Sequence, residues 1–177
     1  MEPERLELEI PSLRTVSDYR QQLIFLENGL NRTQIRNACQ LLQLRQFMIY
    51  LANAYTINRG LGRVFLYNIL RLEADICEGL LYSLQVKYLD QKPKNKVSLE
   101  PLINFAKTIH EPRPLLSRET KKELERLLII RNNLHPTDQA ELHTNLMQIH
   151  CADEDSRRRI LNVHRNLIDD IKRYYDA

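Results

Sequence analysis

The chain has 177 residues, which fits one domain with a sizeable core and leaves no room for a second catalytic domain. Its formal net charge of +3 is only mildly basic, so charge alone does not indicate a nucleic-acid-binding protein. With only four glycines, a glycine-rich phosphate-binding loop is not expected. The three cysteines are far apart in the sequence and do not match a zinc-binding pattern. With no signal peptide or long apolar run, we expect an all-α, cytoplasmic protein without a cofactor.

Residues 1–60 are expected to form an arm and a two-helix extension. Leucine and isoleucine alternate with glutamate over 6–10, before Pro11, which is typical of a short extended arm. Ser17 as N-cap predicts a first helix to about residue 30, and Thr33 predicts a second one to about residue 57. The break that follows is marked by Gly60 and Gly62.

Residues 61–177 are expected to form an up-and-down bundle, giving about six to seven helices in all and one compact domain overall. The longest periodic segment, 63–89, predicts a central core helix. Shorter helices are predicted over about 98–110, 117–135 and 137–151, where serine or threonine caps and prolines mark the ends. The last predicted helix runs over 153–175, with these residues facing inward: Ile160, Val163, Leu167, Ile168 and Ile171.

The end of the 117–135 helix carries the segment Arg131-Asn132-Asn133-Leu134-His135. Residues four apart on a helix are separated by about 40° in azimuth, so the side chains of Arg131 and His135 can serve one small volume. A histidine moves protons near neutral pH, and an arginine binds a phosphate through two hydrogen bonds. RNA cleavage by this pair requires no metal. The competing interpretation is that Arg131 complements the helix dipole and that His135 caps free carbonyl groups.

This segment, at the end of a late amphipathic helix, resembles HEPN domains, in which an Arg-Asn followed by a His closes such a helix. The resemblance covers about 63–175. It implies a bundle of four or five helices that pairs as a homodimer, with both motifs facing one cleft. It also implies Arg131, Asn132 and His135 as catalytic residues, with RNA as substrate. The family includes ribonuclease toxins paired with nucleotidyltransferase-type antitoxins, so an antitoxin of that type is a candidate partner.

A carboxylate from the central helix often accompanies the motif in this family. Glu73 lies in phase with the apolar stripe and should face inward, where its charge needs a partner such as Arg131. Glu78 looks more like the family's helix but is predicted to point toward solvent. We prefer Glu73 as the fourth catalytic residue, while a Glu73 that merely extends its carboxylate to water at the margin of the stripe remains the alternative.

Basic side chains gather on two of the later predicted helices. The candidates for contact with RNA phosphates are Lys121, Lys122, Arg126, Arg157 and Arg158. Interleaved acidic residues also fit an ordinary solvated face. His143, His150 and His164 are spaced so that a metal site is conceivable, but no cluster of Cys or Asp supports it, and we predict none.

Two functions follow. The first is a metal-independent endoribonuclease of HEPN type, in a toxin–antitoxin or antiphage defence setting. The alternative is a catalytically inactive HEPN-like module for dimerisation or partner binding. The spacing favours the alternative, because three residues separate Arg131 from His135 where the family has four to six.

Overall fold

The computed structural model describes residues 13–54, 59–93, 97–110, 113–133 and 153–176, and within these ranges the chain is all-α. The predicted all-α helical bundle is confirmed. The predicted arm at 6–10 and the predicted helix over 137–151 lie outside the described residues. The helices are α1 (Val16–Leu23), α2 (Arg32–Ala54), α3 (Arg59–Leu89), α4 (Leu99–Thr108), α5 (Arg118–Asn133), α7 (Glu154–Ile160) and α8 (Val163–Tyr175), and a 3-10 turn, Ile24–Leu26, follows α1.

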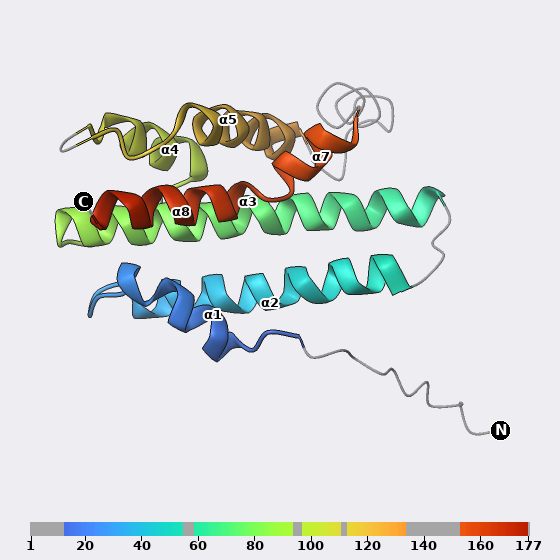
Figure 1. Cartoon of the computed structure of the whole chain (residues 1–177), viewed down its shortest axis with the longest axis horizontal. Coiled ribbons are helices and arrows are strands. Elements are labelled where there is room, and N and C mark those ends of the chain that lie inside the picture. Colours follow the sequence, from blue (N-terminus) through green and yellow to red (C-terminus); the bar gives the residue numbers. More distant parts are fainter. Residues whose placement is uncertain (1–12, 55–58, 94–96, 111–112, 134–152, 177) are drawn as a thin grey trace.

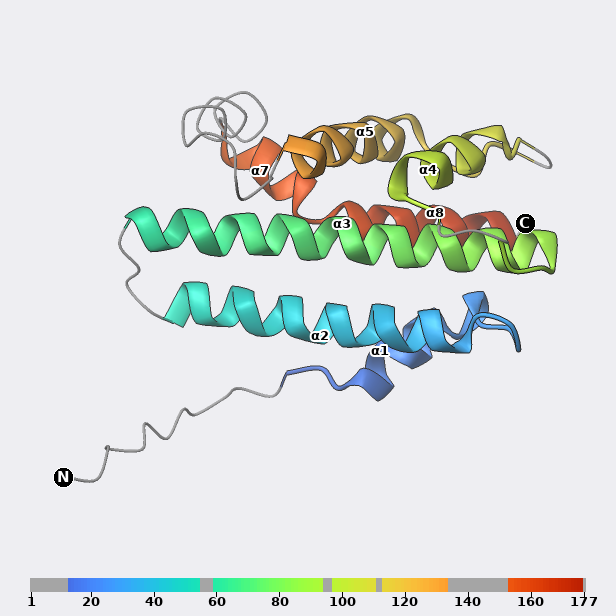
Figure 2. The same cartoon turned by 180° about the vertical axis from the view of Figure 1, so that it is seen from behind.

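Helix α3 is the central element of the bundle. It packs against α2, α4, α5 and α8. Figures 1 and 2 show three layers: α1 and α2 on one side of α3, α4, α5 and α7 on the other, and α8 alongside α3. Helices α2 and α3 run in opposite directions, while α8 runs in the same direction as α3. Among the described residues, none of the helices combines the length and the apolar character that crossing a membrane requires.

One hydrophobic core spans the described helices. In α3, Leu80, Leu81 and Leu84 are all fully buried, which fits a helix covered on several sides. Residues on both sides of the predicted boundary at 60/61 belong to this same core, which includes Leu23, Leu26, Ile35, Leu42, Leu70, Leu102, Leu124, Leu127, Leu167 and Ile171.

Helix α1 begins and ends earlier than predicted. Its N-cap is Thr15 rather than Ser17: the Thr15 hydroxyl accepts from the Asp18 backbone N–H at 3.2 Å, and the Asp18 carboxylate accepts from the Thr15 N–H at 2.7 Å. This reciprocal capping box satisfies two backbone donors that would otherwise lack partners. The helix ends at Leu23, so the prediction of a continuous helix to about residue 30 is wrong.

The break predicted at Gly60 and Gly62 is also wrong, because both residues lie inside α3. A glycine costs a helix interior only about 1 kcal/mol relative to alanine, which is too little to end a helix that packs along most of its length.

The last predicted helix is in fact two, α7 and α8, joined by a turn at Leu161 and Asn162. The Asn162 amide donates to the carbonyl of Arg158 at 2.7 Å, and the guanidinium of Arg45 donates to the carbonyl of Leu161. These contacts satisfy carbonyl groups at the end of α7. The five residues predicted to face inward are nevertheless all buried, so the apolar face is confirmed.

Candidate active site

Arg131 lies in the last turn of α5 and reaches across to α3. Its Nη2 lies 2.9 Å from the Glu78 carboxylate and 3.7 Å from that of Asp75. Asp75 and Glu78 are three residues apart on α3, so they share one helix face. The Arg131 side chain keeps 29% of its surface exposed. The structure therefore holds this guanidinium against two carboxylates of the central helix while leaving part of it open.

The Asp75 carboxyl group feels two opposing effects. Burial raises its pKa, and the positive charges of Arg131 and Arg71 lower it; burial is the larger effect, so the pKa lies above the usual Asp value. Arg131 thus lowers the pKa of this half-buried carboxyl group more than Arg71 does, and both oppose the effect of burial.

The other two motif residues, Asn132 and His135, are not part of this ion-pair cluster in the described structure. Asn132 is exposed at the end of α5, about 100° around the helix from Arg131, and its neighbour Asn133 donates from its amide to the carbonyl of Ile129 at 2.7 Å. His135 lies outside the described residues. The structure therefore brings Arg131 together with Asp75 and Glu78.

Glu73 faces inward as predicted, and its carboxylate is fully buried. The expected partnership with Arg131 is wrong, however. Glu73 accepts from Arg45 Nε of α2 at 2.7 Å and from the His164 backbone N–H of α8 at 2.7 Å, and it lies 2.7 and 2.9 Å from His164 Nδ1. Two residues on a helix are separated by about 200° in azimuth, so Glu73 and Asp75 lie on nearly opposite faces of α3.

Glu78 is the carboxylate that meets Arg131, contrary to the prediction that it points to solvent. Its side chain is 22% exposed because α5 packs across this part of α3. The usable signal in the sequence was the spacing of Asp75 and Glu78, since two acids on one face of a core helix call for a cation from a neighbouring element.

A pocket of about 640 Å³ lies beside these carboxylates, between α2 and α3. Asp75 and Glu78 line it together with the amide side chains of Gln34 and Asn37 and the ring of Tyr82. The pocket therefore presents hydrogen-bonding groups and one aromatic surface next to the site where Arg131 is held.

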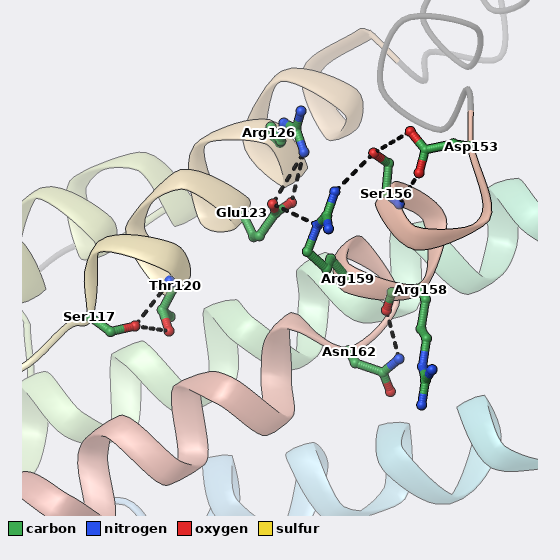
Figure 3. A network of polar contacts seen from close by, with 9 residues as sticks. All are labelled: Ser117, Thr120, Glu123, Arg126, Asp153, Ser156, Arg158, Arg159 and Asn162. Carbon is green, nitrogen blue, oxygen red and sulfur yellow. Dashed lines mark hydrogen bonds and ion pairs between the residues drawn. The ribbon is translucent and has the colours of Figure 1, made fainter.

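Arg126, one of the five predicted RNA contacts, serves in a contact between α5 and α7 (Figure 3). Its Nη1 lies 3.1 Å from the carboxylate of Glu123, whose side chain is only 2% exposed. Arg159 of α7 approaches the same carboxylate at 3.8 Å and donates to the Ser156 hydroxyl at 3.2 Å. Asp153, the N-cap of α7, accepts from the Ser156 backbone N–H at 2.7 Å. Arg126 is thus largely committed to neutralising a buried carboxylate.

The remaining predicted RNA contacts are more open. Arg157 makes a long ion pair with Glu154, at 3.5 Å. Within the described ranges, Lys121, Lys122 and Arg158 have no ion pair, and in Figure 3 the Arg158 side chain points away from Glu123 and Ser156. These three cations are the ones free to meet a phosphate backbone.

Of the three histidines considered for a metal site, His143 and His150 lie outside the described residues, and His164 is bound to Glu73. In the part of the chain that the structure describes, no group of three or more His, Cys, Asp or Glu side chains is placed to hold a metal ion.

In comparisons with known proteins, no family model, no curated protein and no solved structure matches this chain.

Proposed function

We propose that this chain is a metal-independent endoribonuclease of HEPN type, acting in a toxin–antitoxin or antiphage defence setting. The observation that carries the proposal is the anchoring of Arg131, four residues before His135 in the sequence, on Glu78 and Asp75. An arginine side chain that carboxylates already hold in place loses less conformational entropy when it binds a phosphate. A positive charge fixed in this way can stabilise the negative charge of a transition state.

The proposed reaction uses groups of this chain and of the RNA alone. His135 takes the proton of a ribose 2′-hydroxyl, the 2′-oxygen attacks the neighbouring phosphorus, and the bond from phosphorus to the 5′-oxygen breaks. Protonated His135 then gives a proton to the leaving 5′-oxygen, so the products are a 2′,3′-cyclic phosphate and a 5′-hydroxyl. Arg131 stabilises the charge on the phosphate oxygens, and Asn132 orders the end of α5.

The contacts of Arg131 are compatible with this role. Both ion pairs described for it go to Nη2. Since a guanidinium carries five N–H donors, Nη1 and Nε each keep an N–H group that can donate a single hydrogen bond to a phosphate oxygen. Lys121, Lys122 and Arg158 extend the positive surface that an RNA backbone requires.

A homodimer is part of the same proposal, with two copies of the motif facing one cleft. A nucleotidyltransferase-type antitoxin is the partner class we propose for its control.

The test is cleavage of structured RNA by the purified protein in EDTA. We expect wild-type protein to leave 2′,3′-cyclic phosphate ends, and both His135→Ala and Arg131→Ala to lower the rate at least about 100-fold. The matched controls are His110→Ala and Arg36→Ala, which remove an exposed histidine on the segment after α4 and an exposed arginine on α2. Cleavage that persists in His135→Ala would mean that a contaminating nuclease or another site is responsible.

The second candidate function is a catalytically inactive module for dimerisation or partner binding. One observation favours it: two carboxylates already lie against the Arg131 guanidinium, which then holds two helices together. Under this function wild-type protein leaves RNA intact, and Arg131→Ala changes the sedimentation coefficient of the protein, whereas Arg36→Ala does not.

A further inference from the structure

A second polar centre lies on the face of α3 away from Arg131, and it borders a pocket. Arg45, Glu73 and His164 form this centre at the junction of α2, α3 and α8, with exposed fractions of 6%, 0% and 5% for the whole residues. The adjoining pocket has a volume of about 440 Å³, within the range of small-molecule sites. Its polar lining includes Arg14, Tyr19, Arg45, Gln46, His164 and Arg165.

His164 is held in one orientation at the wall of this pocket. The Glu73 carboxylate lies 2.7 and 2.9 Å from its Nδ1 and also accepts from its backbone N–H at 2.7 Å. With Nδ1 bound there, Nε2 points away from Glu73, and no partner for Nε2 occurs among the described residues. A histidine oriented by a carboxylate in this way is preorganised to present its second nitrogen to a ligand.

Three arginines from three segments surround the pocket. Arg14 precedes α1, Arg45 lies on α2 and Arg165 lies on α8. Burial raises the pKa of the Tyr19 hydroxyl above its usual value, and the charges of these three arginines oppose that effect. The Tyr19 hydroxyl donates to Gln46 Oε1 at 2.9 Å, which fixes it at the wall.

The charge of the pocket comes mainly from its rim. Arg45 is balanced by Glu73, whereas Arg14 and Arg165 are exposed and have no ion pair within the described ranges. Asp169 is the one acidic side chain among the lining residues and offsets part of their charge. The apolar part of the lining comprises Leu42, Ile49 and Ile168. The pocket thus joins a cationic rim to an apolar wall.

We propose that this pocket binds a small phosphate monoester carrying an apolar group. Arg14 and Arg165 bind the phosphate, His164 Nε2 hydrogen-bonds to it, and the apolar wall takes the remainder of the ligand. This site is independent of the proposed nuclease site, because Glu73 and the carboxylates bound to Arg131 lie on different faces of α3.

The test is isothermal titration calorimetry with phenyl phosphate, using phenol and inorganic phosphate as its two halves. We expect saturable one-to-one binding of phenyl phosphate with a dissociation constant of about 1 mM or tighter. Each half should bind at least about tenfold more weakly, because it meets only one part of the lining. On binding, the 15N resonance of His164 Nε2 should shift.

Arg165→Met is the decisive variant, since it removes an exposed charge and leaves the buried contacts intact. We expect it to weaken phenyl phosphate binding at least about tenfold. The matched control is Arg36→Met, on the opposite side of α2 from Arg45 because nine residues make two and a half turns. The proposal is overturned if phenyl phosphate shows no saturable binding, if either half binds equally well, or if both variants bind like wild type.

Discussion

Replacing Glu73 with glutamine keeps the shape of the side chain and removes its charge. The Arg45 guanidinium, whose side chain is 7% exposed, then loses its counter-charge 2.7 Å away. Arg45 Nε and the His164 backbone N–H bind different oxygens of the carboxylate, so the glutamine NH2 group faces one of these two donors whichever oxygen it replaces. Removing one partner of a buried pair typically lowers the free energy of unfolding by about 3–5 kcal/mol. Domains are commonly stable by about 5–15 kcal/mol, so we expect Glu73→Gln to fold with a large loss of stability.

Urea unfolding followed by circular dichroism measures this loss. With a slope of about 2–3 kcal/mol per molar urea, the midpoint should fall by about 1–2 M. Glu78→Gln is the matched control on the same helix. Its side chain is 22% exposed and that of its partner Arg131 is 29% exposed, so we expect it to lose about 1 kcal/mol or less.

Two results would refute this reasoning. One is a loss below about 1 kcal/mol for Glu73→Gln, and the other is an equal loss for the two variants. The double variant Arg45→Met/Glu73→Leu adds a second check. It leaves no buried charge without a partner, so it should unfold at a higher urea concentration than Glu73→Gln alone.

Three further predictions concern other parts of the molecule. Arg131→Ala should raise the pKa of Asp75 further, because burial already raises it and Arg131 opposes that effect. The folded state then holds this proton more tightly than the unfolded state, so the contribution to stability is present at low pH and is lost as pH rises through the folded pKa. An unchanged 13C titration of the Asp75 carboxyl would contradict this. Burial raises the pKa of the Cys39 thiol to about 11 and that of the Cys77 thiol well above its usual value. In a Cys151→Ser variant at pH 8, a thiol reagent should therefore label Cys39 and Cys77 only as fast as the protein unfolds. Rapid labelling of both thiols would contradict this prediction. Ser117→Ala should cost about 1 kcal/mol, because the Ser117 hydroxyl accepts from the Thr120 N–H at 3.1 Å at the start of α5. Ser98→Ala is its control, since the Ser98 hydroxyl makes no cap hydrogen bond, and equal losses for the two variants would refute the assignment.

Local sequence patterns predicted the helices and many of their buried faces, because a helix repeats every 3.6 residues and its ends use a small set of caps. The inward face of α8 and the start of α5 after Ser117 follow directly from these rules. The break between α7 and α8 does not. It involves Arg45 and Glu73, which lie 116 residues before Leu161 and 91 residues before His164. No local window contains those contacts.

The candidate site shows the same division. The helical periodicity of the sequence correctly predicted that Glu73 faces inward, but periodicity does not predict which neighbouring helix supplies the counter-charge. Periodicity also predicted, wrongly, that Glu78 points toward solvent. Helix α5 packs over that face of α3, and this packing belongs to the tertiary fold. The position of Arg131 in the last turn of α5 was predicted correctly, because the end of a helix is a local feature of the sequence.

The position of the Glu73 carboxylate also bears on how the chain folds. It joins partners 28 and 91 residues away, so two loops of very different length must close before all its contacts exist. The shorter loop brings α2 to α3 and buries a charge pair that still lacks the backbone N–H of His164. That donor belongs to α8, which is synthesised after α2 and α3. A state in which α2 and α3 are paired before α8 docks would therefore hold a charge pair with incomplete hydrogen bonds, and the docking of α8 would complete them.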